Sequence, residues 1–190
     1  MDIGTALREL GACDIEDLRR AILALGEDDW RGNTQRQDAY DVHHMTQSIV
    51  LVFSDGSGWP EIEVRREHGW KLLADQAVPL MHAIVADHYH PGGTIIRAMA
   101  ARLPAGGIIK PHRDNHPSFH FAHRIHIPIV TNRRVRFLID GRPYRLEVGR
   151  VYEVNNQKSH SVMNRGDRAR INFIFDYLPP EHLGRESGNA

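Results

Sequence analysis

The chain has 190 residues, of which 41% are hydrophobic and 25% are charged, as in a single soluble globular domain. Its 24 basic and 24 acidic residues cancel, which excludes a strong overall field for nucleic acid or an anionic membrane. The single Cys13 excludes an intramolecular disulfide, and no apolar run reaches the roughly 18 residues that span a bilayer. Because residues 1–4 do not resemble the start of a signal peptide, we expect a cytoplasmic protein without a membrane or nucleic-acid partner.

Near its start, the chain carries apolar residues at helical spacing, interrupted by Gly11. This spacing over residues 4–25 predicts two short helices, with Asp14 capping the second. The segment from Gly26 to Trp30 is expected to end the second helix, and residues 31–38 read as a polar loop. The apolar positions are Leu7, Leu10, Ile15, Leu18, Ile22 and Leu25.

The next segments predict one strand and one long helix. Residues 40–53 have β-like composition, and Ile49 to Phe53 is expected to be a short buried strand because of its branched residues. A turn is expected over residues 55–60. Helical periodicity returns from Trp70 to His88, with Pro79 inside it, and Pro91-Gly92-Gly93 is expected to close this helix.

From Thr94 onward the chain reads as short strands and turns. Asp140-Gly141 predicts a tight hairpin between two of them. Eight such strands preceded by helices predict a mainly β fold, a double-stranded β-helix (cupin-like jelly roll) buttressed by the N-terminal helices. We expect one domain over residues 1–190, with helical support and a short strand in 1–90, the jelly-roll core in 91–178 and a tail in 179–190. The expected strands span residues 94–101, 108–112, 123–130, 135–139, 144–148, 151–154, 160–163 and 168–177.

Three residues have the types and spacing of a metal site with open positions. His112 and Asp114 are two residues apart, so on an extended segment both side chains project from one face. His160, at the head of a later β-like run, is the natural third ligand. Two imidazoles and one carboxylate leave positions free on the metal, which suits Fe(II) in oxygen-activating enzymes. The alternative is that His112 and Asp114 form a surface pair in a turn.

A guanidinium ten residues after His160 adds to this pattern. Asn164-Arg165-Gly166 reads as a three-residue hairpin loop with Gly166 in the left-handed conformation, which would place His160 opposite Arg170 on one face. In that register Arg170 can hold a carboxylate bidentately beside the metal. A dicarboxylate such as 2-oxoglutarate needs both ends held, its 2-oxo acid by the metal and its distal carboxylate by an arginine.

Other polar residues compete for roles in the site. A helix would align His112 with His116 and His120, but the prolines around them disfavour a helix, so we expect these two and His123 in loops at the mouth of the site. Arg97 and Arg102 are open between a surface position, which we expect, and a role in the cavity. Solvated strand edges and loops are expected for the basic residues in 133–136 and 142–150.

Arg124 and His126 alternate with isoleucines, so one face of their strand is apolar and the other is polar. That polar face can meet water, or it can line a cavity inside a barrel.

Four stretches resemble the aspartyl/asparaginyl β-hydroxylase family of Fe(II)- and 2-oxoglutarate-dependent dioxygenases, which includes proline 3-hydroxylase-like enzymes. They are KPHRD (110–114), HRIHIPIVTN (123–132), VYEVNNQKSHSVMN (151–164) and RARINFIFDYLP (168–179). The C-terminal half carries the resemblance, and the N-terminal half shares only the general layout.

The resemblance implies His112, Asp114 and His160 as iron ligands and Arg170 as the residue that binds the distal carboxylate of 2-oxoglutarate. Arg124 and His126 are implied to line the site and to contact 2-oxoglutarate or a carboxylate of the substrate. Fe(II) is the implied cofactor, 2-oxoglutarate and O₂ are the implied co-substrates, and ascorbate is an expected stimulatory additive. The implied reaction hydroxylates an unactivated C–H bond of an amino acid, free or within a peptide or protein.

Two positions depart from the animal aspartyl hydroxylase, which has glycine where this chain has Asp114 and arginine where this chain has Ala122. The chain therefore resembles the branch with a complete set of three ligands, and the second departure argues against an aspartyl side chain as the substrate. Two other function classes fit the same scaffold: a metal-binding cupin-like protein without oxygenase activity, such as an isomerase or a sensor, and a non-catalytic interaction module. The first of these has no use for a dicarboxylate clamp at Arg170, and the second would be favoured by the absence of metal after purification and Fe(II) titration.

Overall fold

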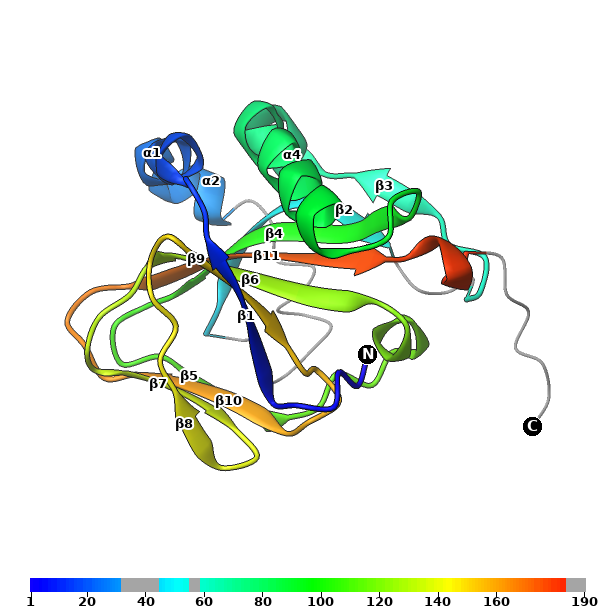
Figure 1. Ribbon diagram of the computed structural model, residues 1–190. Helices are drawn as coiled ribbons and strands as arrows, with labels where there is room; N and C mark the ends of the chain where they lie inside the picture. The colour runs from blue at the N-terminus through cyan, green and yellow to red at the C-terminus, as the bar shows by residue number, and fades with distance from the viewer. Residues whose placement is uncertain (32–44, 55–58, 184–190) are drawn as a thin grey trace.

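Two antiparallel β-sheets face each other, and helices cover the outer side of the larger sheet (Figure 1). The computed structural model describes residues 1–31, 45–54 and 59–183. In spatial order the larger sheet contains β1 (Leu7–Ala12), β9 (Arg150–Val154), β6 (His123–Val130), β11 (Arg170–Leu178), β4 (Thr94–Leu103), β2 (Gln47–Ser54) and β3 (Val64–Arg66). The smaller sheet contains β5 (Ile108–His112), β10 (His160–Asn164), β7 (Val135–Ile139) and β8 (Arg142–Tyr144).

The helices are α1 (Glu16–Ala24), α2 (Glu27–Arg31) and α4 (His68–His88), with the short 3-10 helices η2 (Pro117–His120) and η3 (Pro180–His182). The structure confirms the mainly β, jelly-roll fold with supporting helices. It also confirms the buried strand within β2 and the long helix, which is α4 with Pro79 inside it. No helix in the described part of the chain is long and apolar enough to cross a membrane.

The larger sheet has an apolar outer face and a partly polar inner face. On β6, Ile125 and Ile127 belong to the core beneath the helices, which also contains Leu73 of α4. Arg124 and His126 alternate with these isoleucines and therefore point between the two sheets. A second core fills part of that space, formed by Leu103, Ile109, Phe137, Ile139, Leu146, Tyr152, Val154 and Val162. The interior of the barrel is thus apolar except where β6 and its neighbours supply polar groups.

The first predicted helix is wrong, because Leu7–Ala12 forms strand β1 at the edge of the larger sheet. The three-residue spacing of Leu7 and Leu10 suits a helix, but in the sheet Leu7 packs against the core between the sheets and Leu10 against the core beneath the helices. Pairing with β9 therefore overrides the local helical pattern. The second predicted helix is confirmed as α1, but its N-cap is Ile15, without a side-chain cap, rather than the expected Asp14. Asp14 Oδ1 accepts the backbone N–H of Glu16 at 3.0 Å just before the helix.

Two other expected boundaries differ from the structure. The segment after Gly26 does not end the helical region, since α2 follows at once. The strand expected over 144–148 is instead β8, which begins at Arg142 immediately after the Asp140-Gly141 turn. Both turn residues have positive φ, 48° and 74°, so the expected tight hairpin is confirmed.

The expected hairpin around Asn164-Arg165-Gly166 is wrong, because β10 and β11 belong to different sheets. β10 pairs with β5 and β7, whereas β11 pairs with β4 and β6, so this connection crosses from one sheet to the other. Gly166 is not in the left-handed conformation. A side chain there would collide with Asn132, whose nearest atom would lie 2.5 Å from a Cβ, so close packing explains this glycine.

Several expectations concern residues outside the described ranges. The loop over residues 31–38 and the start of the β-like segment 40–53 fall largely in 32–44, and most of the turn over 55–60 falls in 55–58. Residues 184–190 of the expected tail also lie outside them. Within the described part, β1, β2 and β3 come from the first 90 residues and hydrogen-bond into the same sheet as β4, β6, β9 and β11.

Candidate active site

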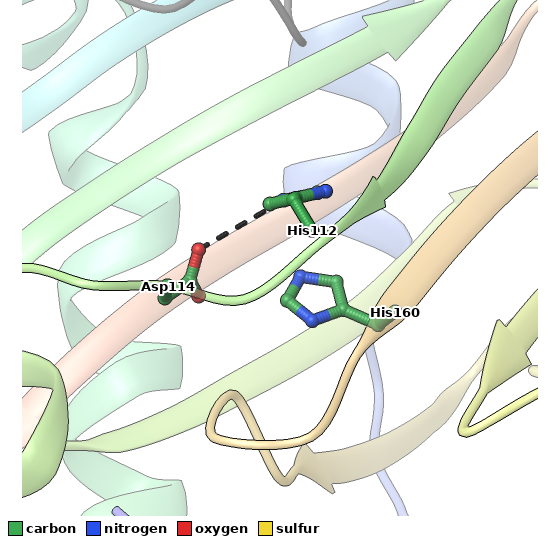
Figure 2. A group of neighbouring side chains, drawn as sticks. All are labelled: His112, Asp114 and His160. Carbon is green, nitrogen blue, oxygen red and sulfur yellow. Dashed lines mark ion pairs between the residues drawn. The ribbon is translucent and has the colours of Figure 1, made fainter.

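His112 and His160 are direct partners on adjacent strands of the smaller sheet. His112 is the last residue of β5 and His160 the first of β10, and they pair across the antiparallel ladder. Their ring centroids are 4.3 Å apart with an interplanar angle of 54°. Figure 2 shows both rings beside Asp114, which follows β5. The ligand atoms of the three side chains all lie within 4.8 Å of one another.

Backbone carbonyls fix the orientation of both imidazoles. Nδ1 of His112 lies 2.8 Å from the carbonyl oxygen of Lys110, and Nδ1 of His160 lies 3.0 Å from that of Lys158. Because a carbonyl oxygen only accepts, each Nδ1 carries the proton and donates it, which leaves the Nε2 lone pair free. Burial lowers the pKa of His160, so this ring is neutral near neutral pH, the form that binds metals. Both rings are therefore set to offer Nε2 to one cation.

Asp114 offers one carboxylate oxygen to the imidazoles and the other to an arginine. Its Oδ1 lies 3.9 Å from Nε2 of His112, and Nη1 of Arg124 donates to its Oδ2 at 2.5 Å. The backbone N–H of Asp114 donates to the carbonyl of Asn156 at 3.2 Å, and Gln157 Nε2 donates to the Asp114 carbonyl at 3.4 Å. The loop after β5 is thus held against the segment that precedes β10.

A buried carboxylate holds Arg124 in place. Asp176 of β11 is 0% exposed and accepts Nε and Nη2 of Arg124 at 2.8 and 2.9 Å. Arg97 of β4 adds a second ion pair to Asp176 at 3.5 Å and donates to Ser118 at 2.9 Å. Burial alone would lower the pKa of Arg124, but the charges of Asp114 and Asp176 outweigh it and raise this pKa. The surface position expected for Arg97 is wrong, since its side chain completes this internal network.

Asp176 was missed by the sequence reasoning, although a signal for it exists. It alternates with Phe173, Phe175 and Tyr177, which lie in the core beneath the helices, so Asp176 must face between the sheets. A carboxylate at such a position needs a buried cation, and β6 pairs Arg124 directly with it.

Arg170 is a buried guanidinium that has no counter-charge within residues 1–31, 45–54 and 59–183. It is 5% exposed, and among the described residues no hydrogen bond or ion pair of its side chain is found. Burial lowers its pKa to about 10, so it remains charged at neutral pH. The ring of Phe137 lies 5.9 Å from its guanidinium carbon. Since a buried unpaired charge is costly, this position is prepared for an anion.

One cavity between the sheets connects these groups. This central cavity is lined by His112, His160, Arg124, His126 and Arg170, together with Thr46 and the apolar residues Ala101, Leu103, Ile109, Phe137, Val162 and Ile174. The polar face of β6 therefore lines a cavity, as one of the two sequence readings held. His126 Nδ1 lies 3.0 Å from Nδ2 of Asn172, a hydrogen bond that ties β6 to β11.

The competing histidines lie outside the metal-ligand group. His116 Nδ1 accepts the backbone N–H of Ser118 at 3.2 Å at the start of η2, and His120 is exposed at its end. His123 donates to the buried Glu153, which Arg8 of β1 also contacts. Arg102 lies away from the central cavity.

The three side chains fit a divalent ion of the first transition series. Two neutral imidazoles and a carboxylate are ligands that such ions accept, and they leave further positions free. At the usual bond length of about 2 Å, neighbouring ligand atoms on one ion would lie roughly 3 Å apart. The three ligand atoms lie within 4.8 Å of one another, so the side chains would have to move closer together to hold one ion.

Comparison with known proteins concerns the chain as a whole rather than single site residues. The chain matches the sequence model of the family described as aspartyl/asparaginyl beta-hydroxylase over residues 14–180, which is most of its length. No curated protein matches the chain.

Solved structures share the fold at low identity. An oxidoreductase of the 2OG-Fe(II) oxygenase family from Burkholderia pseudomallei has a TM-score of 0.55 and 14% identity, over 75% of this chain and 71% of that one. A Pseudomonas putida prolyl-4-hydroxylase has a TM-score of 0.50 and 15% identity, over 92% of each chain. A Trichoplax adhaerens prolyl hydroxylase, solved with a hypoxia inducible factor oxygen degradation domain peptide fragment, has a TM-score of 0.60 and 10% identity, over 95% and 88%. At such identities the likeness shows the fold alone.

Proposed function

The chain belongs to the aspartyl/asparaginyl beta-hydroxylase family, and on this premise we propose that it hydroxylates an unactivated C–H bond of an amino acid, free or within a peptide or protein. As a member of this family, the chain is a 2-oxoglutarate- and Fe(II)-dependent oxygenase. In the proposed reaction O₂ and 2-oxoglutarate are consumed, one oxygen atom enters the substrate, and succinate and CO₂ are released.

The observation that carries this proposal is the shared cavity of Arg170 and the two imidazoles. Arg170, a buried guanidinium without a counter-charge among the described residues, lines the same cavity as His112 and His160, two of the three residues in the ligand group, so we propose that a dicarboxylate bridges them. 2-Oxoglutarate has the matching ends, a chelating 2-oxo acid and a distal carboxylate. Arg170 would take the distal carboxylate by paired N–H donors, which adds direction to the charge attraction.

His112, Asp114 and His160 are the proposed ligands of Fe(II). When bound, Fe(II) supplies the oxidative decarboxylation of 2-oxoglutarate by O₂ that drives hydroxylation of the substrate. The chain itself contributes placement. Backbone carbonyls aim the two imidazoles, and Arg124 occupies Oδ2 of Asp114 so that Oδ1 remains for the ion. Apolar residues such as Val162 and Ile174 limit water in the same cavity.

Arg124 is proposed to be a positioning residue rather than a ligand of 2-oxoglutarate or substrate. Its Nε and Nη2 are committed to Asp176, and its Nη1 to Asp114. A substrate carboxylate would have to displace these buried ion pairs, which is costly. The proposed role of Arg124 thus differs from the one that the resemblance implies. The committed Arg124 and the alanine at position 122 together disfavour an aspartyl side chain as the substrate.

A turnover screen tests the proposed reaction. The protein is incubated with Fe(II), ascorbate, 2-oxoglutarate and O₂ against free amino acids and short peptides, and products are examined by mass spectrometry. We expect one substrate to gain a single oxygen atom together with an equal amount of succinate. Succinate without any hydroxylated product across the set would contradict the proposed substrate class, and oxidation independent of 2-oxoglutarate would contradict the reaction.

A further inference from the structure

Arg170 lines two cavities, and the second has no role in the site described above. This rear cavity has a volume of about 210 Å³, and its lining includes Thr131, Arg133, Phe137, Arg145 and Arg170. The volume corresponds to roughly seven waters of liquid, at about 30 Å³ each. Phe137 and Arg170 line both the rear and the central cavity, so these two side chains form the boundary between them.

The rear cavity lies at the end of the barrel away from the metal ligands. In the pairing of β10 with β7, His160 is opposite Ile139 and the other end of β10 is opposite Val135, which lines the rear cavity. Along β11, Arg170 is the first residue, whereas Asp176 near the other end pairs with Arg124. Figure 1 shows β10 and β11 joined by the connection at this far end.

The charge at the rear cavity is positive. Arg133 and Arg145 are exposed, so the cavity communicates with solvent, and the buried Arg170 is the third cation. No aspartate or glutamate is among the residues that line it, all of which are described. Arg145 has an exposed ion pair with Glu147 at 3.6 Å, and such a pair neutralises little of the field. A cavity lined by one sign of charge concentrates small ions of the opposite sign.

We propose that the rear cavity is a passage through which a small dicarboxylate reaches and leaves Arg170 without passing the metal ligands. The inference rests on the proposed function, because it concerns the same dicarboxylate and the same arginine. The long arginine side chain can turn between the two cavities that it borders. The metal end of the barrel would then remain available to the organic substrate while the dicarboxylate exchanges through the rear cavity.

Two variants of the full-length protein test the passage, with the protein loaded with Mn(II) and radiolabelled 2-oxoglutarate as the probe. Arg133→Glu with Arg145→Glu reverses the charge at the rear opening. Thr131→Trp adds bulk to its lining. Rapid filtration after a chase with unlabelled 2-oxoglutarate gives the dissociation rate, calorimetry gives Kd, and their ratio gives the association rate.

The charge-reversed variant is expected to lose about tenfold in association rate at low salt with little change in dissociation, since steering acts on encounter. Thr131→Trp is expected to slow association and dissociation by the same factor and to leave Kd unchanged, which is the behaviour of a narrowed passage. The matched control is Arg20→Glu with Arg31→Glu, two exposed arginines of α1 and α2 that do not line the rear cavity, which makes the same change in net charge.

Unchanged rates in both rear-cavity variants would overturn the passage. An association rate that falls as much in the control as in Arg133→Glu with Arg145→Glu would also overturn it, because the effect would then follow net charge alone. If the unaltered protein loaded with Mn(II) failed to bind 2-oxoglutarate, the proposed function itself would fail. The two failures are therefore distinguishable.

Discussion

His160 and Arg170 line one cavity from opposite sheets of the barrel, although the strands that carry them share no hydrogen bonds. The separation between the proposed metal ligand and the guanidinium is therefore set by how the two sheets pack. The apolar residues between the sheets, Phe137 and Val162 among them, fix this spacing. Under the proposed function, the fit of a dicarboxylate between the two groups therefore depends on this packing.

Removing the charge of Asp176 should weaken both the fold and the metal site. Asp176→Asn leaves Arg124 and Arg97 buried without their shared carboxylate, so the free energy of unfolding should fall by about 3 kcal/mol. Mn(II) affinity should fall by roughly tenfold or more, because Arg124 no longer holds Asp114. Denaturant unfolding and calorimetric titration measure the two effects. Asp167→Asn, which changes an exposed carboxylate, is the control. Equal free energies of unfolding and equal Mn(II) affinities in the two variants would contradict the proposed role of Asp176.

Loss of either imidazole should abolish metal binding. His112→Ala and His160→Ala each leave only two of the three ligands, so Mn(II) titration should show no high-affinity site. His120→Ala removes an exposed histidine of η2 and should bind Mn(II) as the unaltered protein does. Retained single-site binding in either of the first two variants would show that the ligands lie elsewhere.

The ion pair that fastens β1 should depend on pH. Burial acts to raise the pKa of Glu153, but His123 and Arg8 outweigh it, and the pKa is lowered from 4.5. A carboxylate whose pKa is lower in the folded state stabilises that state at pH values above its unfolded-state pKa. This stabilisation is lost as the pH falls through the folded-state pKa. The unaltered protein should therefore be more stable than Glu153→Gln at about pH 7, and the difference should shrink below about pH 4.5. A difference that is constant with pH in denaturant unfolding would contradict this account.

The helical layer should support the barrel without shaping the site. Leu73→Ala empties a fully buried position of α4 and should lower the free energy of unfolding by about 2–5 kcal/mol. Because Leu73 packs on the outer face of the larger sheet, Kd for 2-oxoglutarate should stay within about twofold at temperatures where the variant is folded. A large change in the Kd for 2-oxoglutarate with no loss of stability would contradict the claim that the helices support the fold but do not shape the site.

The sequence could predict the features that depend on short-range patterns. The spacing of His112 and Asp114 at a strand end, the alternation along β6 and the turn at Asp140-Gly141 are local, and the structure has each of them. Strand β1 could not be predicted in this way, since its pairing with β9 is a long-range contact.

The position of Arg170 shows a different limit. The expected hairpin placed it beside His160 by register, and the structure places both at one cavity through sheet packing instead. The two residues share a cavity although the expected register is wrong, because residues of both sheets that face the space between them line the same cavity. Asp176 was missed and Arg97 was expected at the surface, because a buried ion pair between distant strands leaves no periodic signal except alternation with core residues.

The most direct test of the central claim is the affinity of the Mn(II)-loaded protein for 2-oxoglutarate, measured by calorimetry for Arg170→Ala and for Arg168→Ala. Loss of a buried charge-assisted pair costs about 2 kcal/mol or more, so Arg170→Ala should raise Kd by at least about thirtyfold. Arg168→Ala, an exposed neighbour on the same segment, should leave Kd unchanged. An Arg170→Ala protein that is folded, binds Mn(II) and holds 2-oxoglutarate as tightly as the unaltered chain would contradict the account.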